Sequence, residues 1–280
     1  MYRGVALLTV LSLSSGCPGP DPVLADSGGA DYEVTADQFS CKANNNGMIE
    51  LDELLFEVGA AASYRVNPPG TLVPVENEGK LEKGKRVWDH SSVDGMVAPF
   101  KVEGIEGNAW YASHFPDASF VIGQDLKAET LQVLRLDKAG NRVLLLGLVS
   151  RKPDWTLLIY QPPITIMRFP LKLGLKFTSS GEAQNGKLEG VAIATKDKYE
   201  VEVDAAGLVR MPTLELTHAL RQKVRVQIDT VGGQVIHAFQ YQWFQECFGE
   251  VVRTVAQPTT DGTPPPDNFK KALEYRRLSF

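Results

Sequence analysis

The residues between positions 42 and 53 come closer to a chemical site than any other stretch of this 280-residue chain. They supply side-chain oxygens at short intervals, from Asn44, Asn46, Glu50 and Glu53. Oxygen atoms are the ligands that calcium prefers, and Gly47 in their midst allows a sharp turn of the backbone. The stretch therefore predicts either a cation site or a tight turn built from the same residues.

The spacing resembles a calcium-binding EF-hand loop whose first residue is Lys42. The resemblance implies ligands from Asn44, Asn46, Glu50 and Glu53, and from the main-chain carbonyl of Met48. Lys42 departs from the pattern, because a coordinating aspartate normally stands first, and only one such loop is present. Two interpretations stay open: a weak calcium site, or a degenerate loop kept as a turn in which Asn and Gly tolerate positive φ.

Three cysteines are present, at positions 17, 41 and 247. If Cys17 is chemically modified, Cys41 and Cys247 remain as a pair. In an oxidising compartment such a pair normally forms a disulfide. Free reactive thiols or a metal pair are the alternative, although neither cysteine has a Cys or His at zinc-ligand spacing. We expect a Cys41–Cys247 disulfide that closes a loop over most of the folded chain.

The N-terminus has the features of an export signal. Arg3 precedes an apolar run over residues 5–13, and small residues then lead to Cys17. This pattern resembles the lipobox of bacterial lipoproteins, although Leu13 lies four residues before the cysteine and Ser14 lies three before it. The resemblance implies cleavage before Cys17, a lipid on its thiol, and an exported outer-membrane or cell-surface protein on the periplasmic or extracellular face. An ordinary secretory signal is the alternative.

The chain is expected to divide into five parts. Residues 1–16 are a signal peptide, 17–32 a flexible tether, 33–57 the EF-hand-like segment, 58–256 an antiparallel β domain, and 257–280 a linker with a short C-terminal helix or tail. The tether follows from its prolines and glycines, which suit neither a helix nor a central strand. The β domain divides into two subdomains, 58–127 and 128–256, in one interpretation.

The fold class is predicted as mainly β, a curved antiparallel sheet or sandwich with a short N-terminal helical segment. Apolar residues alternate with polar ones in short runs such as 130–136, 142–150 and 235–243, and turn residues separate these runs. Residues 205–207 are interpreted as a turn. Residues 165–256 loosely resemble a β module of exported bacterial proteins, through Gly207, Pro212, Leu220-Arg221 and Tyr241-Gln242-Trp243. The resemblance implies a curved antiparallel sheet and no activity.

Composition and motifs exclude several functions. The net charge is −5 and no basic patch is present, which argues against a nucleic-acid partner. No hydrolase, zinc or phosphate-binding motif occurs, so we expect a protein that is not an enzyme. Several strand aromatics either fill a core or line a ligand pocket: Trp155, Tyr160, Phe239, Tyr241 and Trp243.

The predicted function is that of a lipid-anchored cell-envelope protein that binds an unknown envelope partner or acts structurally. One alternative is a weak calcium-binding module that uses the 42–53 loop, with calcium as its sole expected cofactor. The other is a carrier that holds an apolar ligand inside a curved β-sheet.

Overall fold

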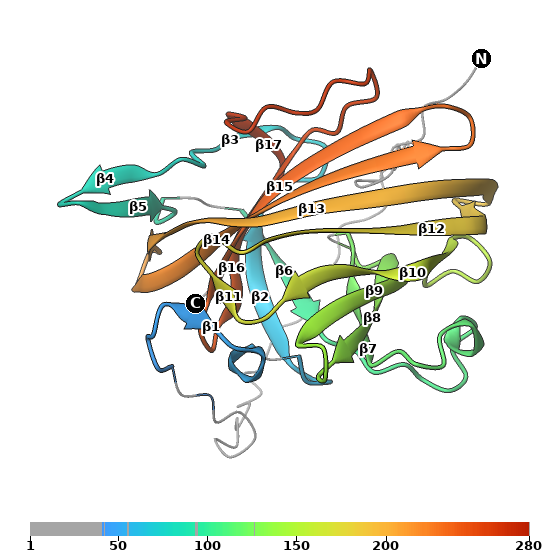
Figure 1. Cartoon of the computed structure of the whole chain (residues 1–280). Coiled ribbons are helices and arrows are strands. Elements are labelled where there is room, and N and C mark those ends of the chain that lie inside the picture. Colours follow the sequence, from blue (N-terminus) through green and yellow to red (C-terminus); the bar gives the residue numbers. More distant parts are fainter. Residues whose placement is uncertain (1–40, 42, 55, 93–94, 126, 280) are drawn as a thin grey trace, which may run out of the picture.

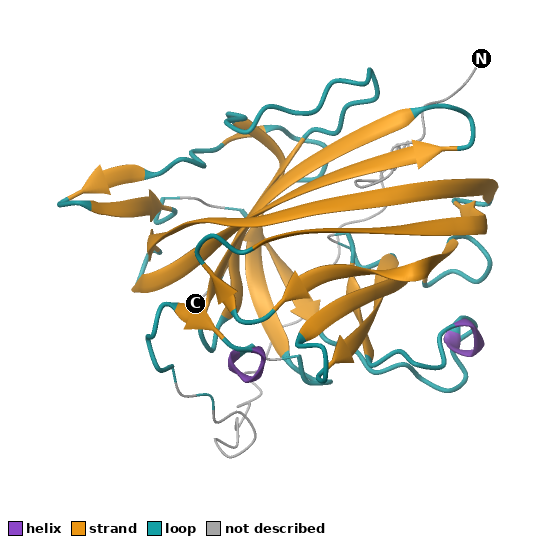
Figure 2. Cartoon of the chain, viewed as in Figure 1, coloured by secondary structure: helices purple, strands orange, loops and turns teal. Residues whose placement is uncertain are grey.

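The computed structural model describes residues 41, 43–54, 56–92, 95–125 and 127–279. The expected signal peptide, the tether with Cys17, and Lys42 lie outside the described residues. The described chain is mainly β, which confirms the predicted fold class. Its helices are the single 3₁₀ turns η1 (Leu51–Glu53) and η2 (Ala112–His114) (Figure 2).

One large sheet contains nearly all the strands, in the order β6-β2-β17-β16-β15-β14-β13-β12-β10-β9-β8-β7 (Figure 1). The bounds along this path are β6 (Met96–Lys101), β2 (Ala61–Val66), β17 (Lys271–Leu278), β16 (Gly249–Ala256), β15 (Val235–Gln245), β14 (Glu215–Thr230), β13 (Val191–Arg210), β12 (Lys176–Leu188), β10 (Leu157–Arg168), β9 (Arg142–Ser150), β8 (Thr130–Asp137) and β7 (Phe120–Gly123). Short strands add to it or lie apart: β1 (Met48–Ile49), β3 (Val73–Pro74), β4 (Lys80–Glu82), β5 (Lys85–Asp89) and β11 (Leu171–Lys172).

The sheet curves round an axis until its two end strands almost meet. Neighbours along the path pair antiparallel, and most of the long strands follow one another in sequence. Beyond β6, Glu103 forms an isolated antiparallel bridge with Val121 of β7. The sheet is therefore nearly closed, with a seam between β6 and β7.

Alternation along the strands separates an inner face from an outer one. On β14, Val224 and Val226 belong to the inner core, whereas Lys223 and Arg225 form ion pairs with acidic residues. The inner core includes Leu145, Leu158, Ile164, Val203 and Phe244.

Two further clusters pack on the outer face. In the first, Trp88 of β5 contacts Trp243 of β15 edge to face, with ring centroids 5.8 Å apart. In the second, Tyr111 and Phe115 pack against residues of β7 to β9 such as Val149. These layers explain why strands in the middle of the sheet are buried on both faces.

The C-terminal helix expected within residues 257–280 is wrong. Residues 271–278 form strand β17 and not a helix, because β16 and β2 pair with them on either side and take up their backbone hydrogen bonds. The β domain therefore extends to Leu278, and residues 257–270 are a loop that joins β16 to β17. The strands β2 and β6, from the expected first subdomain, belong to the same sheet as the strands of the second.

The expected turn at residues 205–207 is also wrong. The chain continues through it as strand β13 and pairs with β14 on one side and with the parallel strand β5 on the other. A Cβ atom on Gly207 would collide with the carbonyl oxygen of Arg86 and lie 2.9 Å from the Trp88 ring. This glycine therefore allows a close approach of β5 and is not a turn residue.

Candidate functional site

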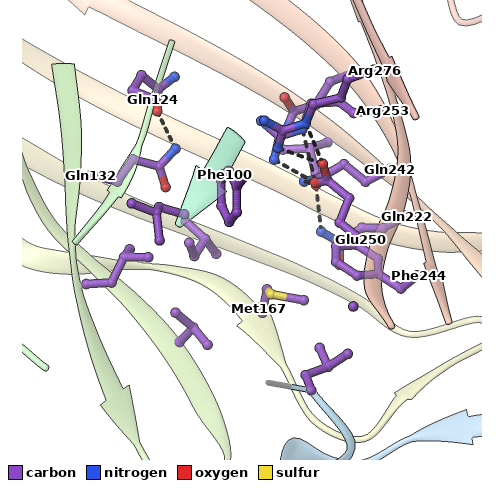
Figure 3. A pocket seen from close by; sticks show the side chains of 18 of the residues that line it. Phe100, Gln124, Gln132, Met167, Gln222, Gln242, Phe244, Glu250, Arg253 and Arg276 are labelled. Atoms are coloured by element: carbon purple, nitrogen blue, oxygen red, sulfur yellow. Dashed lines mark hydrogen bonds and ion pairs between the residues drawn. The ribbon is translucent and has the colours of Figure 1, made fainter. Parts of the chain in front are cut away.

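The inner face of the curved sheet surrounds a cavity of about 240 Å³ (Figure 3). Its apolar walls come from strands far apart in the sequence, with side chains such as Leu134, Val143, Leu145, Met167, Val224 and Phe244. These residues lie at alternate positions of their strands, so the pattern that builds the core also builds the cavity. Much of the space is therefore suited to an apolar group.

A row of polar side chains interrupts the apolar wall, and we call it the polar belt. It consists of Gln222 on β14, Gln242 on β15, Glu250 and Arg253 on β16, and Arg276 on β17. These strands follow one another in the sheet, so Glu250 and Arg276 lie side by side although 26 positions separate them in the sequence. Figure 3 shows the belt grouped on one side of the cavity.

Glu250 is the centre of the belt. Arg253 donates from Nε and Nη2 to Glu250 Oε2, at 3.0 and 2.6 Å. Arg276 Nε donates to Oε1 at 2.8 Å, and its Nη2 lies 2.6 Å from the same oxygen. The three side chains are no more than 12% exposed. Burial alone would raise the pKa of Glu250, but the two guanidinium groups outweigh it and hold the pKa below its usual range, so this carboxylate is ionised.

Two glutamines extend the belt as a directed relay. Gln242 Nε2 donates to Glu250 Oε2 at 2.6 Å, and Gln222 Nε2 donates to Gln242 Oε1 at 3.2 Å. An ionised carboxylate only accepts hydrogen bonds, so it fixes which end of each amide faces the next. Gln222 Oε1 is left at the end of the relay with no hydrogen-bond partner among the described residues.

Aromatic rings support the arginine end of the belt. The Arg276 guanidinium lies 5.2 Å from the centroid of the Tyr64 ring and 5.3 Å from that of Phe100. The Tyr64 hydroxyl donates to the carbonyl oxygen of Glu250 at 2.6 Å. Cation–π contacts of this kind hold a guanidinium in a fixed orientation. On the opposite wall, Gln132 Nε2 donates to Gln124 Oε1.

The N-terminal segment closes part of the cavity. Leu54 and Phe56 line it, and the Phe56 ring stacks on Phe120 with centroids 5.8 Å apart. The segment is tied to the sheet by a disulfide between Cys41 and Cys247, which confirms that expectation. Cys247 N also donates to the Glu53 carbonyl at 2.9 Å.

The loop predicted to bind calcium brings its oxygens together in hydrogen bonds of its own. Asn44 Oδ1 accepts from Asn46 N and Asn46 Oδ1 accepts from Met48 N, each at 2.8 Å. Glu53 accepts from Asn44 Nδ2 at 2.5 Å and from Glu50 N at 2.8 Å. Main-chain and amide donors thus hold these oxygens in a turn, which is the second of the two interpretations. Within the described ranges, no group of three or more His, Cys, Asp and Glu side chains forms a metal cluster. Calcium binding stays a prediction.

The polar belt is not among the sites predicted from the sequence. A signal was present, because Gln222 shares the phase of Val224 and Val226 on β14, and Gln242 shares that of Ala238 and Phe244 on β15. Polar residues at inward positions of a strand indicate a ligand site or a buried network.

The five strand aromatics have different places. The rings of Phe239, Tyr241 and Trp243 pack in the outer cluster, and Phe239 also contributes to the cavity lining. Tyr160 belongs to the inner core and Trp155 is 41% exposed. Among the five, only Phe239 lies at the cavity, and its ring packs in the outer cluster, so these aromatics act mainly as core residues.

Comparisons with protein-family models, with curated proteins and with solved structures find no match for this chain. Among the helices of the described residues, none is long and apolar enough to cross a membrane.

Proposed function

We propose that the protein is a non-enzymatic, lipid-anchored protein of the cell envelope that carries a small apolar ligand inside its curved sheet. The observation that carries this proposal is the cavity, with its apolar walls and one polar side. Ligand sites are typically concave and mostly apolar, with a few polar groups that set the orientation of the ligand. The lipobox-like residues that end at Cys17 support the anchor.

The size of the cavity limits the ligand. The cavity has a volume of about 240 Å³. Pockets for drug-sized ligands typically measure about 300–1,000 Å³. We therefore propose a ligand with a single chain, and not a sterol or a lipid with several chains.

Mass spectrometry of the exported protein tests both parts of the proposal. Under denaturing conditions, the mass should equal that of a chain beginning at Cys17 plus its lipid. A chain that begins at Cys17 without added lipid mass would contradict the anchor. Organic extraction of the same preparation should release a bound ligand.

A cavity-filling variant provides the control for the extraction. Ala62→Phe places a ring at a partly buried position that lines the cavity. Ala139→Phe makes the same change in an exposed turn. We expect the extracted amount of ligand to fall at least tenfold in Ala62→Phe and to stay unchanged in Ala139→Phe. Equal amounts from both variants would show that the extracted molecules do not come from the cavity.

A further inference from the structure

The polar belt decides which polar group a ligand in the cavity can carry. Two arginines that converge on one point commonly bind an anion in proteins, because guanidinium groups match carboxylate and phosphate oxygens. Here Arg253 and Arg276 converge on Glu250, with one guanidinium on each carboxylate oxygen. The protein's own carboxylate occupies the anion position, so an anionic ligand would have to displace it.

The charges around the belt also balance. Glu274, which is buried on β17, has Oε1 3.9 Å from Arg276 Nε. The two arginines therefore face two carboxylates. Moving an ionised group from water into a buried site costs free energy that must be recovered from charges of the opposite sign. Because the charges of the belt balance, they offset little of the cost of burying an ionised ligand group. An uncharged polar group of a ligand has no such cost.

The amide relay adds a hydrogen-bond acceptor to this neutral wall. Gln222 is 2% exposed, and its Oε1 has no partner among the described residues. A buried polar atom without a partner is unfavourable, so a ligand that donates a hydrogen bond to it would gain affinity. A hydroxyl group can donate a hydrogen bond to this oxygen, which an ionised carboxylate cannot do.

We infer that the ligand is an uncharged single-chain amphiphile, such as a fatty alcohol, whose hydroxyl lies against the polar belt and whose chain fills the apolar part of the cavity. This inference rests on the proposed carrier function. It adds the chemical class of the ligand and assigns the selection against anions to Glu250.

Calorimetric titration of the whole exported protein with decanol and with decanoate at pH 8 tests the inference. The two probes share a chain and differ in the charge of the polar end. We expect decanol to bind at least tenfold more tightly. Equal or tighter binding of decanoate would overturn the inference and leave the carrier function standing, whereas binding of neither probe would overturn the carrier function itself.

A charge variant tests the role of Glu250 directly. Glu250→Gln removes the carboxylate from between the two arginines, so decanoate affinity should rise at least tenfold and the preference should invert. The double variant Glu250→Gln/Arg253→Gln balances the charges again and should prefer decanol. Glu246→Gln is the matched control, because Glu246 is buried but accepts its hydrogen bond from Asn45 N, outside the cavity lining.

Each outcome of the variant experiment bears on the inference. Unchanged decanoate affinity in a folded Glu250→Gln protein would overturn the role of Glu250. If Glu250→Gln does not fold, the inference is tested by comparing the affinities of decanol and decanoate for the wild-type protein and for the charge-balanced double variant.

Discussion

At the residue scale, two buried titratable side chains outside the cavity lining carry shifted pKa values. Burial raises the pKa of Asp197 to about 6, and its Oδ2 accepts a hydrogen bond from Tyr160 at 2.7 Å. Burial lowers the pKa of His90 to about 4, and its Nδ1 lies 3.1 Å from the Tyr275 hydroxyl. The two groups affect stability in opposite directions between pH 4 and 6, so each must be tested by its own variant.

Asp197→Asn should change the pH dependence of stability. Between its unfolded pKa of 3.8 and about 6, the folded protein holds a proton that the unfolded chain releases. The free energy of unfolding therefore falls as pH rises through this window, and the favourable contribution is lost above about pH 6. We expect Asp197→Asn to match the wild type near pH 4 and to exceed it at pH 7 by up to about 3 kcal/mol.

Urea unfolding at a series of pH values measures this difference, in which the contribution of His90 cancels. Asp117→Asn provides the control, because the Asp117 side chain is 75% exposed and should give no such slope. If the free energy of unfolding depended on pH in the same way in Asp197→Asn and in the wild type, protonation of Asp197 would not contribute to the pH dependence of stability.

The calcium-like loop also illustrates a limit of sequence reasoning at the residue scale. Asn44, Asn46 and Glu53 offer oxygens at the spacing of a cation site, and the same oxygens accept hydrogen bonds from amides of the loop. Asn and Gly suit both uses, because both tolerate the left-handed backbone that such turns need. Asn45 and Gly47 have φ values of 54° and 80°. Residue types alone therefore do not separate the two interpretations.

At the element scale, the N-terminal segment is held by its disulfide together with buried side chains such as Ile49 and Leu54. Its described secondary structure is the short strand β1, which pairs with β11, and the single turn η1. Cys41 and Cys247 are separated by 206 positions, so their bond restricts a very large loop of the unfolded chain. The bond joins the segment that carries Leu54 and Phe56 to the turn between β15 and β16.

Cys247→Ser should lower the free energy of unfolding by several kcal/mol. The chain-entropy estimate for so long a loop is about 5 kcal/mol, which is an upper value because residual structure in the unfolded chain reduces it. Urea unfolding without reductant measures the loss.

Cys41→Ser removes the same bond, so the losses should not add in the double variant. Additive losses, or a single variant as stable as the wild type, would contradict a stabilising disulfide.

Strand β17 shows why the type of a short element is hard to predict. Residues 268–278 place apolar side chains at a spacing that also suits a helix. Nothing in this stretch of sequence indicates that β16 and β2 lie on either side of it. Pairing with strands that are distant in the sequence makes this segment a strand. The polar belt was not predicted for a related reason, because Glu250 and Arg276 come into contact only when β16 and β17 pair.

At the scale of the whole molecule, the fold class was predictable because alternation is a local property of each strand. Residues 130–136, 142–150 and 235–243 correspond to strands β8, β9 and β15. Closure of the sheet was not predictable, because the bridge between Glu103 and Val121 and the pairing of β2 with β17 join separate parts of the chain. The cavity is a consequence of that closure.

The central claim is that a ligand chain lies inside the sheet, and the methionines allow a direct test. Met167 lines the cavity, Met96 is 49% exposed on β6, and Met211 is buried in the outer cluster. In a protein with isotopically labelled methionine methyl groups, NMR can record which methyl group contacts the chain of added decanol. We expect the Met167 methyl to shift and to show cross-relaxation with the chain, while the methyl groups of Met96 and Met211 stay unchanged. Contacts to Met96 or Met211 with none to Met167 would place the ligand outside the cavity and contradict the account.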